Sequence, residues 1–249
     1  MKRLYYILIG IVLVSCSSET AWDCIQSAGK IIQVETSVTE FSAIIVNRDI
    51  ELIVNQGIEH GVVIETGENL LSDIEVKVVD GELQLIDNNT CNFVRDYGIT
   101  KVYVTAPNLT RIRNSSQFTV SSPGILTYED LTLIAENFAD PESFAIGDFS
   151  LHINNSKIQI VSNNIGSFYI KGSTQDLNIG FFAGSGRFEG GELIAKNVIV
   201  YHRGNNDMVV NPQLSLMGEL FGTGNLIAVN RPPTVNVEQF YIGELIFED

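Results

Sequence analysis

The stretch Ile158–Pro232 reads IQIVSNNIGSFYIKGSTQDLNIGFFAGSGRFEGGELIAKNVIVYHRGNNDMVVNPQLSLMGELFGTGNLIAVNRP. Glycines recur in it at intervals of 18, 20 and 18 residues: Gly166, Gly184, Gly204 and Gly222. An apolar residue follows each glycine by four positions: Ile170, Phe188, Met208 and Leu226. A small polar residue follows each by one position: Ser167, Ser185, Asn205 and Thr223. A near-fixed period of this kind is typical of stacked coils, each of which packs only on its neighbours.

Short apolar couplets recur through the second half of the chain: Leu131/Leu133, Leu151/Ile153, Ile158/Ile160, Leu177/Ile179, Val198/Val200 and Leu214/Leu216. A coil of about twenty residues is too short for a strand, a full helix and a second parallel strand. It suits strands joined by tight corners, with neighbouring coils about 4.8 Å apart. We therefore predict an all-β fold built as a parallel β-helix-like stack. The four glycines would mark its corners, and the row containing Ile170 would point inward.

The N-terminal part, residues 31–108, shows strands with apolar and polar residues in alternation. Asp80-Gly81 separates two of these strands and is typical of a tight hairpin turn. The coil repeats would occupy residues 109–232. A last strand or two in residues 233–249 would cap the open end of the stack.

Residues 1–15 resemble the signal peptide of a bacterial lipoprotein. Two basic residues precede Leu4–Leu13, an apolar segment too short to cross a bilayer, which takes about 20 helical residues. Leu13-Val14-Ser15-Cys16 resembles a lipobox, in which cleavage leaves a diacylglyceryl-modified cysteine at the N-terminus. We expect Cys16 to anchor the chain in the bacterial outer membrane, facing either the periplasm or the exterior, and residues 16–30 to form a tether. An ordinary secretory signal is the alternative.

The formal net charge of −15 restricts the partners of the chain. An acidic surface repels the phosphate backbone, so nucleic-acid binding is not expected. Solubility is the ordinary consequence of such a charge. Binding of a cation or of a cationic partner is the alternative.

Beyond Cys16, the remaining cysteines are Cys24 and Cys91. An oxidising compartment favours a disulfide between such a pair, although two separate buried thiols are the alternative. Neither cysteine lies near a histidine in sequence, and there is no CxxC segment, so we expect no metal centre and no cofactor.

A series of short segments, in this order, resembles one family: Phe41-Ser42-Ala43-Ile44, Asp49-Ile50-Glu51-Leu52, Glu65–Leu71, Asp80-Gly81-Glu82-Leu83, Tyr103–Leu109, Gly222–Leu226 and Arg231-Pro232. It is the head GIN domain family, also named for autotransporter adhesins and common on Bacteroidetes lipoproteins. The likeness extends over about residues 31–247. It implies a right-handed parallel β-helix-like fold over residues 31–249, and it brings no established activity. The positions of Cys24 and Cys91 match one branch of the family.

Catalytic residues are not evident in the sequence. The three histidines, His60, His152 and His202, lie on separate segments, and nothing in their spacing requires them to converge. Arg187 and Asp207 follow neighbouring corners by three positions and would form an ion pair. A further set of acids, Asp140, Glu142 and Asp148, could bind calcium weakly, although a solvated turn is the ordinary interpretation.

Several aromatic residues lie on neighbouring coils: Phe181, Phe182, Phe188, Tyr201 and Phe221. They would fill the core unless some of them face outward and stack on a sugar or a peptide. The leading functional hypothesis is a lipid-anchored, non-enzymatic envelope protein that binds a glycan or an envelope protein in the manner of an adhesin. The alternatives are a polysaccharide-processing enzyme, which would need paired carboxylates in a groove, and a purely structural envelope component.

Overall fold

The computed structural model describes residues 23–89, 91–138 and 143–248, which form an all-β protein with one continuous sheet. Two short 3₁₀ helices lie outside the sheet: η1 (Asp23–Ile25) precedes the first strand, and η2 (Leu71–Asp73) lies in a connection between strands. The strands are β1 (Ile31–Thr36), β2 (Ala43–Arg48), β3 (Ile50–Gln56), β4 (Gly61–Gly67), β5 (Ile74–Val79), β6 (Glu82–Asp87), β7 (Thr100–Ala106), β8 (Arg111–Ser116), β9 (Val120–Leu126), β10 (Asp130–Ala135), β11 (Phe149–Ser162), β12 (Phe168–Phe181), β13 (Phe188–His202), β14 (Met208–Leu220), β15 (Leu226–Ala228), β16 (Thr234–Gln239) and β17 (Leu245–Phe247). Neither described helix has the length or apolar character needed to cross a membrane.

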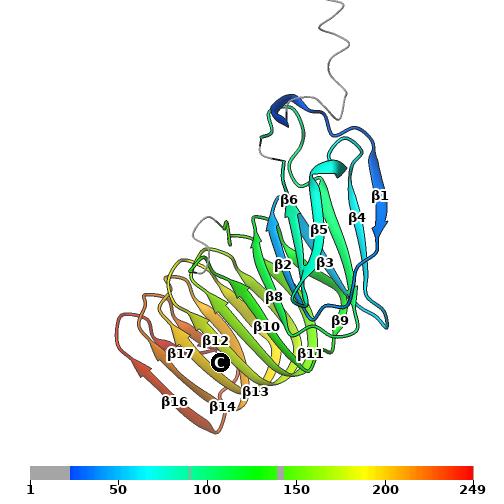
Figure 1. Ribbon diagram of the computed structural model, residues 1–249. Helices are drawn as coiled ribbons and strands as arrows, with labels where there is room; N and C mark the ends of the chain where they lie inside the picture. Colours follow the sequence, from blue (N-terminus) through cyan, green and yellow to red (C-terminus); the bar gives the residue numbers. More distant parts are fainter. Residues whose placement is uncertain (1–22, 90, 139–142, 249) are drawn as a thin grey trace, which may run out of the picture.

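Parallel pairing organises most of the sheet into two rows of strands (Figure 1). The first row contains β7, β3, β9, the first parts of β11–β14, β15 and β17. The second row contains β6, β2, β8, β10, the second parts of β11–β14, and β16. Each long strand bends between its two parts, so the sheet curls around a common core and is nearly closed.

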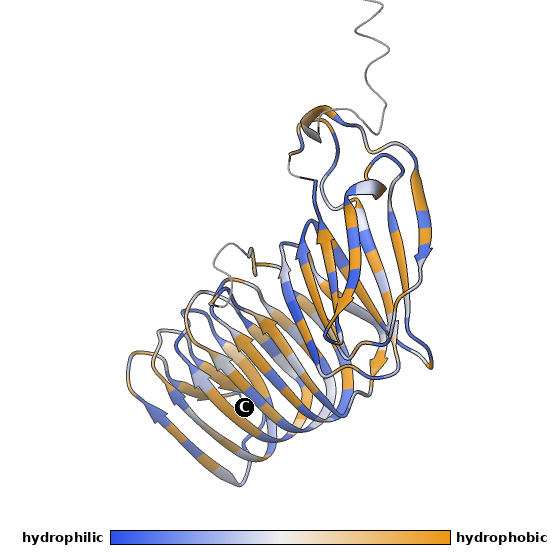
Figure 2. Cartoon of the chain, viewed as in Figure 1, coloured by the Kyte–Doolittle hydropathy of each residue, from blue (hydrophilic) through white to orange (hydrophobic). Residues whose placement is uncertain are grey.

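The core consists of inward side chains that stack from strand to strand. In the first row, the register aligns Val102, Leu52, Val120, Phe149, Phe168, Phe188, Met208 and Leu226, all fully buried. Polar and apolar residues alternate along the strands (Figure 2), because successive residues point to opposite sides of the sheet. The predicted couplets from Leu131/Leu133 to Val198/Val200 are buried in the same way. The prediction that both residues of the last couplet point inward is wrong. Leu214 is exposed, whereas Leu216 is buried and aligns with Val198.

Three of the corner glycines, Gly184, Gly204 and Gly222, stack on one another. The backbone N–H of Asn205 donates to the carbonyl of Gly184 over 3.0 Å, and that of Gly224 donates to the carbonyl of Gly204 over 3.3 Å. Gly166 also lies in a corner, between β11 and β12, but it approaches Gly147 and Gly186 and not Gly184. Phe168 aligns with Phe188, so Asn164 is the residue beside Gly184.

The apolar row predicted from the glycines needs the same two-residue correction. Phe168, not Ile170, aligns with Phe188, Met208 and Leu226. Ile170 is buried and aligns instead with Leu151. Counting from the glycines failed here, because Gly166 lies two residues nearer to its strand than the other three glycines do.

The N-terminal strands belong to the same stack and add antiparallel strands beside it. β5 and β6 form the predicted hairpin, and both Asp80 and Gly81 have the positive φ angles that this tight turn requires. β4 pairs antiparallel with β7, and β1 pairs antiparallel with β4. A disulfide joins Cys24, in η1, to Cys91, in the segment between β6 and β7.

The C-terminal strands extend the stack. β16 pairs in parallel with β14, and β17 pairs in parallel with β15. Within the described residues, their outer edges pair with no other strand. The last strands expected in residues 233–249 are therefore present as β16 and β17, and they form the final layer at the open end of the stack.

Candidate functional site

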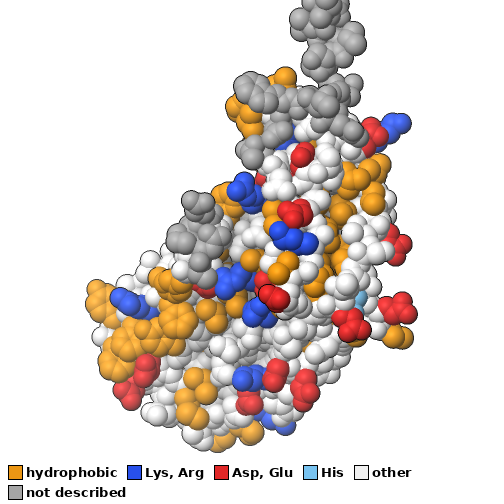
Figure 3. All heavy atoms as spheres, viewed as in Figure 1, with side chains coloured by type: hydrophobic (Ala, Val, Ile, Leu, Met, Phe, Trp, Pro, Cys, Tyr) orange, Lys and Arg blue, Asp and Glu red, His pale blue; other side chains and the backbone are white. Residues whose placement is uncertain are grey.

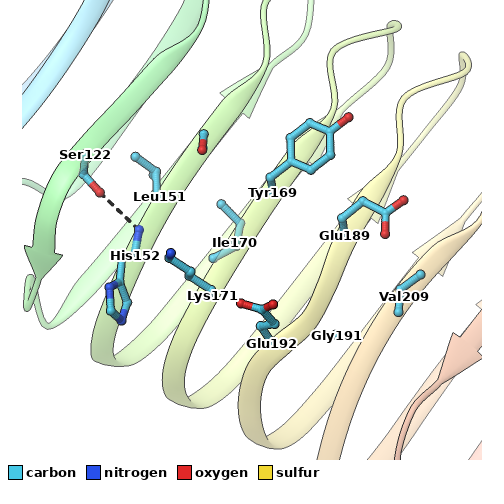
Figure 4. A pocket seen from close by; sticks show the side chains of 11 residues that line it. Ser122, Leu151, His152, Tyr169, Ile170, Lys171, Glu189, Gly191, Glu192 and Val209 are labelled. Atoms are coloured by element: carbon cyan, nitrogen blue, oxygen red, sulfur yellow. Dashed lines mark hydrogen bonds between the residues drawn. The ribbon is translucent and has the colours of Figure 1, made fainter.

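A groove of about 460 Å³ crosses the outer surface of the first row of strands (Figure 4). Its walls come from β9 and from the first parts of β11–β14. The polar and aromatic side chains of this groove, hereafter the polar groove, are Ser122, Ser150, His152, Tyr169, Lys171, Glu189 and Glu192. They lie there because they occupy outward positions of strands whose inward positions build the core.

The polar groove combines one aromatic ring with charged groups of both signs. Tyr169 is about half exposed, and Lys171 and Glu192 lie on the neighbouring strands β12 and β13. Glu189 is held by Arg187, with an Nη2–Oε1 distance of 2.6 Å. Exposed carboxylate and ammonium groups around a ring suit a polyhydroxylated ligand, because such a ligand offers both hydroxyl groups and apolar ring faces.

A second surface is a column of aromatic rings at the corner that follows the second row of strands. The column, hereafter the aromatic stripe, consists of Phe182, Tyr201, Phe221 and Phe240. Its ring centroids are 5.2, 5.3 and 4.5 Å apart in that order. These separations follow the distance between neighbouring strands, so each ring comes from a successive layer.

Gly180 makes room for the first ring of the stripe. A Cβ atom at this position would lie 2.8 Å from the Phe182 ring. Gly180 aligns with Tyr201 in the next strand, so the Phe182 ring folds over the glycine and reaches the tyrosine.

Exposed aliphatic side chains extend the aromatic stripe into an apolar patch. Ile199 and Met217 flank it on β13 and β14, and Tyr241 and Ile242 follow Phe240. Figure 3 shows apolar side chains gathered over this end of the molecule, where the last strands lie. A continuous exposed apolar patch of this kind usually marks an interaction surface.

Some of these aromatic residues were candidates from the sequence alone. Phe181 and Phe188 are buried in the core, as the ordinary interpretation held, whereas Phe182, Tyr201 and Phe221 belong to the stripe. Phe240 was missed, although it follows Phe221 by 19 residues and so fits the coil period. The couplets Phe181-Phe182 and Tyr201-His202 show why composition alone could not sort these residues: adjacent residues on a strand face opposite ways.

The three histidines occupy separate places. His60 Nε2 hydrogen-bonds to the carbonyl of Phe41 over 2.8 Å, and the two rings are in contact. His152 lines the polar groove. His202 is fully buried, and its ring contacts the ring of Phe181 edge-on. Its Nδ1 accepts a hydrogen bond from the backbone N–H of Gly204. Burial lowers the pKa of His202, and this is only partly opposed by the Asn206 backbone and the Asp207 carboxylate.

We predict that His202 makes the stability of the fold depend on pH. Because its pKa is lower in the folded state, the unfolded chain binds the proton first as pH falls below about 6.5. The free energy of unfolding should then fall with pH, by up to about 1.4 kcal/mol per pH unit, until the folded imidazole is itself protonated. Thermal unfolding at pH 7.5 and pH 5.5 measures this loss. His202→Asn keeps an acceptor for Gly204 and should lower stability at both pH values while reducing the difference between them; an unchanged difference would contradict the prediction.

The acids near the corners bind backbone groups. Asp148 accepts a hydrogen bond from the N–H of Ser167, and Asp207 accepts one from the N–H of Asn225, each over 2.8 Å. The predicted ion pair between Arg187 and Asp207 is replaced by the pair between Arg187 and Glu189. Asp140 and Glu142 lie outside the described residues. Among the residues that are described, no three His, Cys, Asp or Glu side chains gather in a way that could hold a metal ion.

A small polar cavity of about 30 Å³ lies beside the segment that follows β6. Burial raises the pKa values of both Asp87 and Asp49, and the charge of Arg95 partly opposes this. Asp87 Oδ1 accepts hydrogen bonds from the backbone and the side chain of Asn89, over 2.8 and 2.7 Å. Gln117 Nε2 donates to Asp49. The bonds between Asp87 and Asn89 hold the start of the segment to the end of β6.

The lipobox and Cys16 lie outside the described residues. The family can be decided independently of them, because the family model described as "Putative auto-transporter adhesin, head GIN domain" matches residues 40–232. The chain belongs to the head GIN domain family. The resemblance found in the sequence is thereby confirmed, and membership in an adhesin-like family indicates a protein of the cell envelope or cell surface. No curated protein matches the chain.

Solved structures similar to this head GIN domain protein support the fold. A crystal structure described as a putative adhesin from Bacteroides fragilis has a TM-score of 0.80 and 21% identity, covering 89% of this chain and 99% of its own. One described as a putative adhesin from Parabacteroides distasonis has a TM-score of 0.61 and 19% identity, covering 89% and 99%. A putative lipid binding protein from Parabacteroides distasonis has a TM-score of 0.58 and 14% identity, covering 89% and 98%.

Proposed function

We propose that this protein is a lipid-anchored, non-enzymatic envelope adhesin that binds a protein partner through the aromatic stripe. The observation that carries the proposal is the column of four rings at the surface, whose end rings Phe182 and Phe240 are exposed. The exposed side chains of Ile199 and Met217 extend it into an apolar patch. Aromatic side chains and methionine are enriched at protein interfaces, and clusters of them supply most of the binding energy. The family and the neighbours described as adhesins agree with a binding role.

The geometry of the rings favours a protein over a glycan at the stripe. A sugar stacks on the open face of an aromatic ring. Here, Phe221 and Phe240 are stacked with an interplanar angle of 4°, and Phe182 and Tyr201 with one of 30°. Each inner ring therefore has one face stacked on an end ring, and the two inner rings contact each other at an angle of 38°. This arrangement leaves little open ring face for a sugar. A surface made of packed rings and aliphatic side chains is better matched to the apolar side chains of a protein partner.

The anchor and the architecture complete the proposal. Cys16 would carry the lipid, in the outer membrane of a bacterium, with the stack projecting from the bilayer. The stack itself would be a right-handed parallel β-helix. The parallel pairing of Phe149, Phe168, Phe188 and Met208 at intervals of 19 to 20 residues supports this interpretation.

Substitution of the open ends of the stripe tests the proposal. We expect Phe182→Ser/Phe240→Ser to weaken binding to an array of purified envelope proteins by at least about 30-fold, since two interface hot spots cost about 2 kcal/mol or more in sum. Ile194→Ser is the matched control, because Ile194 and Phe240 are both 53% exposed. Binding should be measured by interferometry with the full chain, after thermal unfolding has shown that each variant is folded. Equal binding by both variants would rule the stripe out as the binding surface.

The polar groove favours a second candidate, glycan binding. Tyr169 offers a single half-exposed ring, with Lys171 and Glu192 placed to bind hydroxyl groups. On a glycan array, Tyr169→Ala would then abolish binding while the stripe variant kept it. Turnover of a polysaccharide that is lost in Glu192→Gln would instead establish the enzymatic alternative. An absence of both protein and glycan ligands would favour a structural component of the envelope.

A further inference from the structure

The segment between β6 and β7 places apolar side chains where a tight turn normally places polar ones. Asn92–Arg95 forms a turn closed by its own ends: Asn92 Oδ1 accepts from the N–H of Arg95 over 2.9 Å, and Asn92 Nδ2 donates to the carbonyl of Arg95 over 2.8 Å. The two central residues are Phe93 and Val94. Turn centres usually hold Gly, Pro, Asn, Asp or Ser. Here Phe93 is 80% exposed and Val94 is also exposed.

The polar groups of this turn face the protein. Arg95 donates through Nη2 to the carbonyl of Cys91 over 3.0 Å and through Nη1 to the carbonyl of Gln26 over 3.2 Å. The N–H of Phe93 donates to the carbonyl of Cys24 over 2.9 Å, beside the disulfide. The turn is therefore fixed from behind, and its apolar side chains cannot fold back into the core without breaking these bonds.

Two further apolar side chains are exposed on the same segments. Ile25 follows Cys24, and Tyr97, which is 73% exposed, follows the turn. We call Ile25, Phe93, Val94 and Tyr97 the apolar turn surface. Figure 3 shows apolar side chains at the end of the molecule where the described chain begins, and Figure 1 shows that β16 and β17 lie at the opposite end.

The position of the apolar turn surface identifies its occupant. The described chain begins at Asp23, seven residues after Cys16. A chain of seven residues spans at most about 25 Å. If Cys16 carries lipid, the disulfide and the turn beside it stay within that distance of the acyl chains. Interfacial contact favours an amphipathic ring such as Tyr97 together with apolar side chains such as Phe93.

We propose that the apolar turn surface rests on the lipid bilayer and that the stack projects away from it. The proposal rests on the lipid anchor of the proposed function and adds a second contact to it, because one tether alone would leave the stack free to tilt. The aromatic stripe, on the last layers, would then lie at the end of the molecule farthest from the membrane. The net charge of −15 argues against attraction by anionic lipids, so the contact should form on zwitterionic phosphatidylcholine and resist salt.

A tryptophan reporter tests the contact in the full chain. Trp22 is the only tryptophan, so Trp22→Phe gives a silent background in which Tyr97→Trp reports on the turn. Ile58→Trp is the matched control, since Ile58 is 94% exposed in the connection between β3 and β4. The full chain is produced in a bacterium with an outer membrane and reconstituted into phosphatidylcholine vesicles whose acyl chains carry bromine near the headgroup.

We expect the emission at position 97 to fall at least about twofold in brominated vesicles, because an interfacial side chain lies about 5–10 Å deep, at the headgroup boundary. Emission at position 58 should not change. Adding Phe93→Ser and Val94→Ser should restore the emission at position 97 while the melting temperature stays the same, since both side chains are exposed.

Other outcomes overturn the proposal. Full emission at position 97 would mean that the surface is away from the lipid, and quenching at both positions would mean that the molecule lies along the membrane. A third outcome is hydrogen exchange in the turn that slows as the protein concentration rises in the absence of vesicles. That result would assign the surface to a second copy of the chain. The mass of the N-terminal peptide shows separately whether Cys16 is lipidated. Quenching at position 97 in a chain without lipid would leave the contact intact and remove the proposed anchor.

Discussion

Gly184→Ala should lower the free energy of unfolding by about 3–4 kcal/mol, and the cause is the corner that this glycine builds. Gly184 has a φ of +87°, and a Cβ atom there would lie 2.2 Å from the carbonyl oxygen of Asn164 in the preceding layer. The left-handed conformation costs an alanine about 1–2 kcal/mol. The backbone must also move apart, which weakens the hydrogen bonds that Asn164 accepts from the N–H groups of Ser185 and Gly186, at 3.1 and 3.0 Å. Each such bond contributes about 1 kcal/mol.

Three other glycines separate these two costs. Gly81 has a φ of +76° with open space around it, so Gly81→Ala measures the conformational cost alone. Gly222 has no positive φ, but its Cβ would lie 2.1 Å from the carbonyl of Gly204, so Gly222→Ala measures the close approach alone. Gly124 has neither feature and should tolerate alanine within about 0.5 kcal/mol.

Calorimetry of the four variants provides the measurement. A loss of 3–4 kcal/mol corresponds to a fall in melting temperature of about 10 °C for a chain of this size. The order expected for the loss is Gly184, then Gly222 and Gly81, then Gly124. If Gly184→Ala had the same melting temperature as Gly124→Ala, the layers would be able to separate at the corner without cost. Close packing of the corners would then not stabilise the stack.

The corners also show how far the sequence could predict this fold. The period of the glycines identified the repeat and its corners, because a close approach of backbones favours glycine, which has no Cβ. The register between β12 and β13 was not predictable from the glycines, since Asn164 aligns with Gly184 and Gly166 lies two residues later. For the same reason, the residue of β12 that aligns with Phe188 is Phe168 and not Ile170.

The candidate surfaces were less predictable than the fold. Adjacent residues of a strand point in opposite directions, so Phe181 is buried and Phe182 is exposed, and a one-residue error of register exchanges them. The polar groove gathers Tyr169, Lys171 and Glu192 from two layers, which requires a register that the sequence did not supply. The exposure of Phe93 was also not predictable, because phenylalanine is among the residue types most often buried.

Removal of the disulfide should be as costly as the corner substitution. Cys24 and Cys91 enclose a loop with a sequence separation of 67 residues. In the chain-entropy model, a loop of this length stabilises the folded state by about 4 kcal/mol, because the bond restricts the unfolded chain. We therefore expect Cys24→Ala/Cys91→Ala to melt about 10 °C below the parent protein. Phe93→Ser, which alters an exposed neighbour and keeps the disulfide, should melt with the parent.

The full loss is expected only if the N-terminal segment unfolds together with the stack. The pairing argues that it does, since β1 pairs with β4, β4 pairs with β7, and β7 pairs in parallel with β3 inside the stack. Hydrogen exchange in the double variant distinguishes the two cases. Faster exchange that reaches β3 and β9 would mean one cooperative unit. Faster exchange confined to η1 and the Asn92–Arg95 turn would mean that the disulfide stabilises the apolar turn surface alone, and the melting temperature of the stack would then stay unchanged.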